Sequence, residues 1–132
     1  MYAFVRCFAA FYILNGLSML VAPDLWYELT PGVAETGAFN SHFVRDIGIA
    51  FLASGCGLFY ALSKIESIDY KSASLSLFFL AGHSGLHLAG LLFGDMSVAE
   101  MLRDFLLVVL PVLGATFCLF RLKRAELIDL RA

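Results

Sequence analysis

The sequence predicts an all-α integral membrane protein in which four hydrophobic helices form an up-down-up-down bundle. The chain is 61% apolar and 15% charged, whereas an average soluble domain is about 45–50% apolar and about 25% charged. Its mean hydropathy is +0.85. Four apolar runs each approach the ~20 residues that a helix needs to cross a bilayer. A length of 132 residues leaves room for one domain.

The single membrane domain is expected to cover 1–132, with spans at about 3–22, 42–62, 72–93 and 97–120. The first run is expected to stay as an anchor, because no small-x-small cleavage site ends it and Pro23 follows directly. The outer loop 23–41 contains Trp26, which suits a short helix at the headgroup level. Pro111 predicts a kink in the fourth span.

The basic residues predict the orientation of the chain. Loops 23–41 and 94–97 contain no Lys or Arg, while the opposite ends of the spans are basic. Because basic residues concentrate on the cytoplasmic side, we expect both termini there, with the tail 121–132 as a basic continuation of the last helix. The residues that support this orientation are Arg6, Lys64, Lys71, Arg121, Lys123, Arg124 and Arg131.

Several classes of protein do not fit the sequence. The net charge is −2, and no basic patch indicates a nucleic-acid partner. The cysteines, Cys7, Cys56 and Cys118, are odd in number and widely spaced, so they predict apolar packing and not a disulfide or thiol zinc site. No Gly-rich phosphate loop, GxSxG or HExxH motif is present.

Ionisable residues concentrate in the outer half of the spans. A charged side chain at the bilayer centre costs about 2.5–3.5 kcal/mol on insertion scales, so such residues face a protein interior or water. Helical spacing aligns them along one face of each of the last three spans. We therefore expect a shared polar pocket whose candidate contacts are His83, His87, Asp46, His42 and Asp104.

This pocket is expected to bind a metal cation or a small ligand. His83 and His87 have the i,i+4 spacing that allows two imidazoles to bind one metal ion. Imidazole with a carboxylate suits Zn, Cu or Fe. Haem is less favoured, because two histidines on one helix cannot bind opposite faces of one haem. Arg45 and Arg103 are expected to orient the carboxylates of this pocket. Alternatively, they pair with Asp104 and Asp46 across the parallel helices and neutralise them.

Structural roles remain open for the same residues. The cluster can instead set the register of the helices through paired charges. Ser97-x-x-Glu100 has the pattern of a capping box, which would explain Glu100 without a ligand. Asn15 is expected to make an interhelical hydrogen bond. The pattern Val44-Arg45-Asp46 recurs as Leu102-Arg103-Asp104, either through an internal duplication or by chance.

The segment Asn40-Ser41-His42-Phe43-Val44-Arg45-Asp46-Ile47-Gly48, the preceding Ala22-Pro23-Asp24-Leu25-Trp26-Tyr27 and the pair His83 and His87 carry a resemblance. The chain resembles a group of small, uncharacterised bacterial inner-membrane proteins with four predicted helices, closely over its first half and loosely beyond it. The resemblance implies a bacterial plasma-membrane location and a role for these polar positions. It implies no activity.

Three function classes follow from these patterns. The first is an inner-membrane protein whose periplasmic pocket binds a metal cation or small ligand. The second is a non-catalytic small subunit or assembly factor, packed in a homo-oligomer or a larger membrane complex. The third is an enzyme that acts on a quinone or lipid, with Asp46 and a histidine as acid–base partners. No nucleophile accompanies that pair, so an enzyme is the least favoured class.

Overall fold

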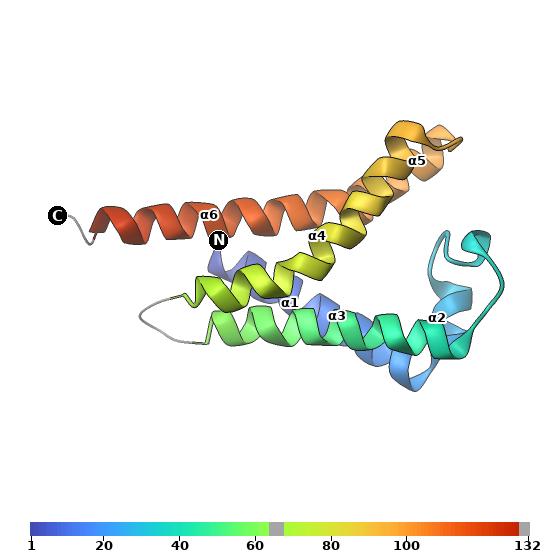
Figure 1. Ribbon diagram of the computed structural model, residues 1–132, viewed down its shortest axis with the longest axis horizontal. Coiled ribbons are helices and arrows are strands. Elements are labelled where there is room, and N and C mark those ends of the chain that lie inside the picture. Colours follow the sequence, from blue (N-terminus) through green and yellow to red (C-terminus); the bar gives the residue numbers. More distant parts are fainter. Residues whose placement is uncertain (64–67, 130–132) are drawn as a thin grey trace.

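The computed structural model describes residues 1–63 and 68–129, and these residues form helices without any strand. Four helices are long and apolar enough to cross a membrane: Tyr2–Val21, Ser41–Ala61, Tyr70–Phe93 and Val98–Ile128. They run alternately up and down (Figure 1). The predicted all-α bundle of four apolar helices is therefore confirmed. Lys64 and Arg131, which contributed to the predicted orientation, lie outside the described residues.

The first two spans form the tightest part of the bundle. They are α1 (Tyr2–Val21) and α3 (Ser41–Ala61). A Cβ atom on Gly16 would lie 2.6 Å from the carbonyl oxygen of Gly48, and one on Gly55 would lie 2.8 Å from that of Ala9. Because these distances are too short for any side chain, only glycine allows the two backbones to approach so closely.

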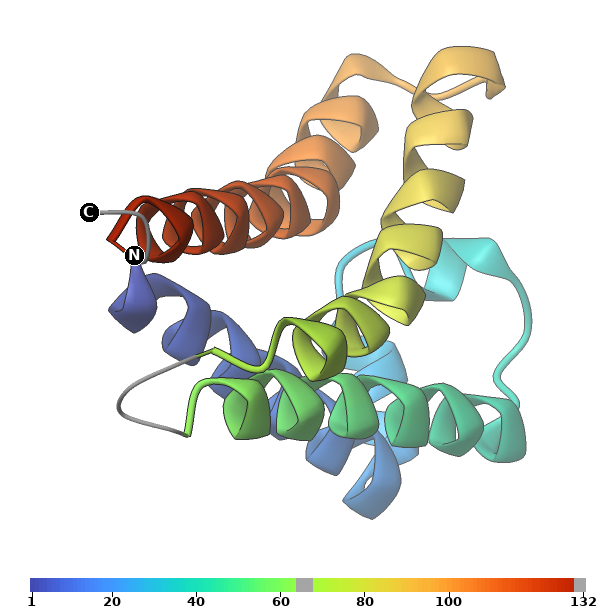
Figure 2. The same ribbon diagram turned by 60° about the vertical axis from the view of Figure 1, so that its left-hand side comes forward.

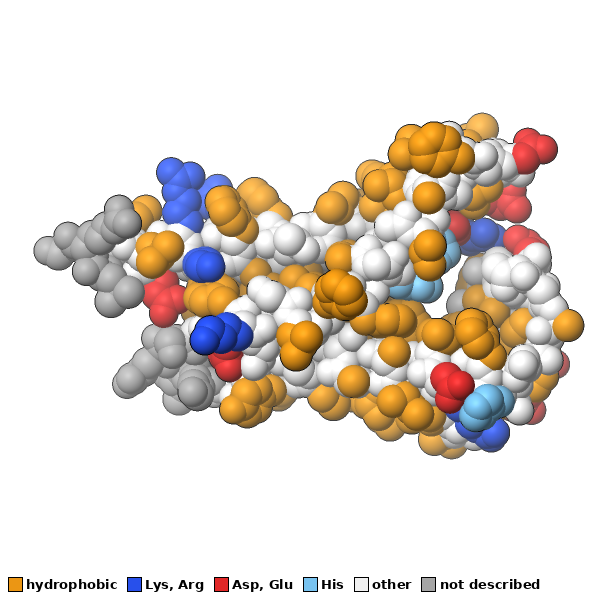
Figure 3. All heavy atoms as spheres, viewed as in Figure 1, with side chains coloured by type: hydrophobic (Ala, Val, Ile, Leu, Met, Phe, Trp, Pro, Cys, Tyr) orange, Lys and Arg blue, Asp and Glu red, His pale blue; other side chains and the backbone are white. Residues whose placement is uncertain are grey.

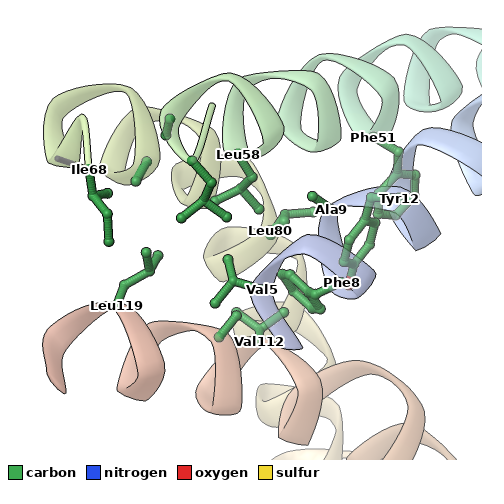
Figure 4. Close-up of a cluster of buried hydrophobic side chains, with 14 of the residues drawn as sticks. Val5, Phe8, Ala9, Tyr12, Phe51, Leu58, Ile68, Leu80, Val112 and Leu119 are labelled. Carbon is green, nitrogen blue, oxygen red and sulfur yellow. The ribbon is translucent and has the colours of Figure 1, made fainter. Parts of the chain in front are cut away.

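A hydrophobic core joins all four spans at the end of the molecule that holds the N-terminus. Leu58 of α3 and Leu80 of α4 (Tyr70–Phe93) are fully buried there. Val5 of α1 and Val112 of the last span pack around them (Figure 4). Many other large apolar side chains are exposed; Phe93, for example, is 88% exposed. Such exposure fits a surface that faces lipid.

The fourth span consists of three pieces that differ in their helical turn. The α-helix α5 (Val98–Asp104) is followed by a π-helical turn, η2 (Phe105–Val109), and by α6 (Leu110–Asp129). Pro111 cannot donate a backbone hydrogen bond, and its ring would clash with a carbonyl one turn earlier in a regular helix. The wide turn before it relieves that clash, and the span bends between α5 and α6 (Figure 2). The kink and the helical continuation to Asp129 agree with the sequence predictions.

The opposite end of the molecule is more open. The second half of α4 and the start of the fourth span bend away from α1 and α3 (Figure 1). The connection between α1 and α3 lies at this end and contains α2 (Pro23–Leu29) and the short 3-10 helix η1 (Ala34–Thr36). Asn40 closes this connection by accepting hydrogen bonds from the first backbone N–H groups of α3.

Candidate functional site

A large cavity lies between the two diverging parts of the bundle. Its volume is about 1350 Å³, which exceeds the ~300–1,000 Å³ of most small-molecule sites. All four spans and the α1–α3 connection contribute to its wall. Figure 3 shows the notch where the two parts separate, with histidine, basic and acidic side chains in its wall. Apolar residues form the rest of the lining, among them Ile47, Phe51, Phe79, Leu107 and Val108.

A chain of polar contacts runs along one side of this cavity. His87 Nδ1 lies 2.7 Å from Asp104 Oδ2. The other carboxylate oxygen of Asp104 accepts a hydrogen bond from Arg103 Nε at 2.9 Å. Arg103 Nη1 lies 3.4 Å from Glu35 Oε2 on the outer connection. The Asp104 side chain is 11% exposed and that of Glu35 is 64% exposed, so this series of polar contacts extends from the interior to the surface.

The Asp104 carboxylate fixes the state of the neighbouring histidine ring. A carboxylate that already accepts from an arginine offers only acceptor atoms, so His87 Nδ1 carries the proton and donates it. In the neutral ring, the second nitrogen of His87, Nε2, then acts as an acceptor. Neither this atom nor the ring nitrogens of His83 have a hydrogen-bond partner within residues 1–63 and 68–129. Three imidazole nitrogens are therefore left for water or a ligand.

Aromatic side chains surround His83 at the inner end of the cavity. Its ring centroid lies 5.2 Å from that of Phe51, edge to face, and 6.0 Å from that of Phe79, stacked. Tyr12 stacks on the other side of Phe51 at 5.3 Å. The centroids of His83 and His87 are 4.8 Å apart. The two histidines thus lie between an aromatic part of the cavity, Phe51 and Phe79, which we call the aromatic floor, and a polar part, Asp104 and Arg103, which with the histidines we call the polar wall.

The outer connection closes part of the cavity. Gly32 has φ of +84°, and a Cβ atom there would collide with the guanidinium of Arg103. The α2 helix is fixed to α1 through Trp26, whose Nε1 donates to Asn15 Oδ1 at 2.9 Å. Both of these residues line the cavity. Asn15 therefore makes a hydrogen bond between two helices, α1 and α2, as the sequence analysis expected.

The polar start of α3 lies apart from this cavity. His42 Nε2 is 3.4 Å from Asp46 Oδ2, and the two side chains are 89% and 54% exposed. Arg45 donates from Nε to the carbonyl of Leu20 at 3.3 Å. None of these three residues is among those that line the cavity. The predicted convergence of polar faces from three spans is thus reduced to α4 and the start of the fourth span.

The packing of α3 explains this difference. Its buried face contains Val44, Gly48 and Phe51, because the glycine must contact α1. Successive residues of an α-helix are about 100° apart, so the neighbouring positions 42, 45 and 46 turn outward. The alternative in which Arg45 and Arg103 pair across the helices with Asp104 and Asp46 is wrong for the same reason. Arg103 pairs with its own neighbour Asp104 and with Glu35.

Glu35 contacts Arg103 of the polar wall, and Phe51 and Phe79 line the cavity, although no sequence pattern indicated them. The acidic character of the outer connection was visible, but no spacing rule links position 35 to position 103. Ser97 and Glu100 form a reciprocal capping box at the start of α5, with Ser97 N donating to Glu100 Oε2 at 2.7 Å. Neither of them lines the cavity. Their contact is local to the helix end.

Among the residues that the structure describes, no three His, Cys, Asp or Glu side chains are grouped closely enough to bind a metal ion. The chain matches no protein-family model, no curated protein and no solved structure. Any function must therefore be argued from the cavity and its side chains.

Proposed function

We propose that this multi-pass membrane protein binds a small amphipathic organic molecule in the cavity at the open end of its bundle. The observation that carries this proposal is a cavity of about 1350 Å³ with an apolar lining and one polar wall. The unpaired nitrogens of His83 and His87 are part of that wall. Both histidines are partly exposed, and a ligand that covers their nitrogens has to supply hydrogen-bond partners, because an unpaired polar group costs about 1–3 kcal/mol once it is buried.

The position of the cavity favours entry from the bilayer. Phe78, Leu86 and Leu107 line it and are also 80%, 75% and 60% exposed. Its wall is therefore continuous with the apolar outer surface of the helices. An apolar molecule that is dissolved in the membrane can enter sideways without crossing water, while its polar end moves towards the histidines.

The charge distribution supports a ligand site in the outer half of the membrane. Basic side chains gather at the end of the molecule opposite the notch (Figure 3), where the start of α4 and the second half of α6 lie (Figure 1). These segments contain Lys71, Arg121, Lys123 and Arg124. The positive-inside rule assigns that basic end and both termini to the cytoplasm. The cavity then belongs to the outer half of the membrane, which is the periplasmic half in the bacterial inner membrane that the sequence resemblance implies.

An organic ligand fits this site better than the metal cation that the sequence suggested. Asp46 and His42, two of the expected ligands, lie outside the cavity. Asp104 already accepts from two side chains, which leaves the two histidines as the available ligands for a metal. Zn, Cu or Fe binding stays a prediction of the sequence pattern, and elemental analysis of the purified protein tests it directly.

A pair of glycine substitutions tests the proposal. Gly82 lines the cavity and Gly85 does not, yet neither has an atom within 4 Å of a Cβ position. Leucine at either position therefore gains the same helix propensity without a clash. We expect Gly82→Leu to reduce the amount of organic molecule that co-purifies with the protein, and Gly85→Leu to retain the wild-type amount.

Mass spectrometry of solvent extracts from protein in lipid nanodiscs provides the measurement. Extracts that contain only the bulk nanodisc lipids in all three proteins would overturn the proposal. One Zn, Cu or Fe atom per chain that is lost in the double variant His83→Ala, His87→Ala would overturn it in favour of a metal centre.

A further inference from the structure

We infer that the ligand is an uncharged lipid alcohol, meaning an apolar molecule whose polar end is a single hydroxyl group. This inference rests on the proposed function and concerns the chemistry of the polar wall. Three observations lead to it: the charges at the wall, the donors and acceptors that remain unpaired there, and the aromatic floor next to them.

The charges at the wall disfavour an anionic ligand. Arg103 is the only Lys or Arg among the described residues that line the cavity. Its guanidinium already contacts the carboxylates of Asp104 and Glu35, at 2.9 Å and 3.4 Å. A phosphate or carboxylate would have to compete with both for this one cation, and it would approach two negative charges at close range.

The unpaired nitrogens select for a group that both donates and accepts. In the neutral His87 ring Nε2 accepts, because the other nitrogen of that ring donates to Asp104. A neutral His83 ring offers one N–H donor and one acceptor. A hydroxyl group can donate to His87 Nε2 and accept from His83 at the same time. An ether or ketone oxygen only accepts, so it leaves His87 Nε2 without a partner.

The two rings stand close enough together for one polar group to contact both. Their centroids are 4.8 Å apart and their planes are 68° apart, edge to face. A hydroxyl group beside this pair would form hydrogen bonds of ordinary length, about 2.8–3.0 Å, to a nitrogen of each ring. The remainder of the ligand would then lie against Phe51 and Phe79, the rings that contact His83. These side chains favour an unsaturated or ring-containing apolar body.

The tryptophan at the cavity provides a direct readout. Trp26 is the only tryptophan in the chain and lines the cavity. Its fluorescence can therefore be followed during titration of protein in nanodiscs of neutral lipid. The probes share one apolar chain and differ only in the polar end: geranylgeraniol, its methyl ether and its monophosphate. Affinities are expressed per mole of probe in the bilayer, so that differences in partitioning do not contribute.

We expect the alcohol to bind about tenfold more tightly than the ether, because the ether leaves one acceptor unpaired. The phosphate should bind more weakly than the alcohol. His87→Gln should abolish the preference for the alcohol, since the glutamine side chain does not place an acceptor where the imidazole Nε2 lies. His83→Phe preserves the ring that packs on Phe79, and should weaken binding of both the alcohol and the ether, because each accepts from the His83 N–H. The matched control His42→Ala changes an exposed histidine and should behave as wild type.

The outcomes separate this inference from the proposed function. Equal affinities for alcohol and ether, or tighter binding of the phosphate, would overturn the hydroxyl assignment while the amphipathic-ligand function stands. A Trp26 signal that none of the probes changes, together with solvent extracts free of a specific molecule, would overturn both.

Discussion

The protein contains the same Arg-Asp pair in two places, and the two pairs have different surroundings. Arg45-Asp46 lies near the start of α3, and Arg103-Asp104 lies at the end of α5. Both follow an aliphatic residue, and both belong to spans that run in the same direction. The Asp46 side chain is 54% exposed, whereas that of Asp104 is 11% exposed.

The difference shows that packing, and not the local pattern, decides what such a pair does. Among the described residues, Asp46 contacts His42 alone, one turn earlier on an exposed face, where an ion pair contributes about 0.2–1 kcal/mol. Asp104 accepts from His87 on another span and from Arg103 beside it. Its removal leaves two donors without a partner in a cavity. The predictions below break or sharpen this contrast.

The largest difference is expected between Asp104→Ala and Asp46→Ala. The first variant should lower the free energy of unfolding by about 2–3 kcal/mol, because both His87 and Arg103 lose a charged acceptor. The second should change it by less than about 0.5 kcal/mol. Unfolding in mixed micelles, followed by circular dichroism, measures both. Similar losses in the two variants would contradict the contrast between the two Arg-Asp pairs.

A smaller difference is expected between Arg103→Ala and Arg45→Ala. Arg103 connects α5 to the outer connection through Glu35, while Arg45 reaches one backbone carbonyl. We expect Arg103→Ala to cost about 1.5 kcal/mol and to speed hydrogen exchange around Gly32. Arg45→Ala should leave exchange in that segment unchanged. Exchange followed by mass spectrometry distinguishes them, and equal rates in both variants and the wild type would show that Arg103 does not hold this segment.

Two glycines of the outer connection sharpen the role of Arg103 further. Gly32 and Gly37 both have positive φ, but only at Gly32 would a Cβ atom collide with the guanidinium. Alanine at either position should cost about 1 kcal/mol of stability through backbone strain. Only Gly32→Ala should also alter Trp26 fluorescence, because it displaces Arg103 from the cavity wall. A fluorescence change of the same size in Gly37→Ala would argue against this explanation.

The smallest effect is expected for His42→Ala. Its ring is 89% exposed, and its contact with Asp46 is 3.4 Å long. Stability should stay within about 0.5 kcal/mol of wild type, and the extracts should contain the same molecule. A loss of ligand in this variant would show that the start of α3 takes part in binding after all.

The fold was predictable because lipid imposes strong rules on sequence. Long apolar runs, basic ends and a proline within a span each act locally, so the spans, the bend and the capping box at Ser97 follow from spacing alone. The pairing of His83 with His87 also lies within one helix. These parts required no knowledge of how one helix packs on another.

The partners across the site could not be predicted in this way. The rotation of α3 depends on Gly16, Gly48 and Gly55, whose role as a contact with α1 becomes visible only in three dimensions. That rotation removes Asp46 from the cavity. The contact between Arg103 and Glu35 spans 68 positions in the chain. No periodicity connects residues so far apart.

The π-helical turn Phe105–Val109 has a consequence for how the fourth span can evolve. Successive residues of an α-helix point about 100° apart around its axis. One extra residue in the wide turn therefore rotates the side chains before the turn by roughly that angle relative to those after it. Val112 and Ala115 are buried in the core, while Asp104 faces His87 in a different direction. Deleting a single residue from the turn would realign the two halves and carry the carboxylate away from the histidine.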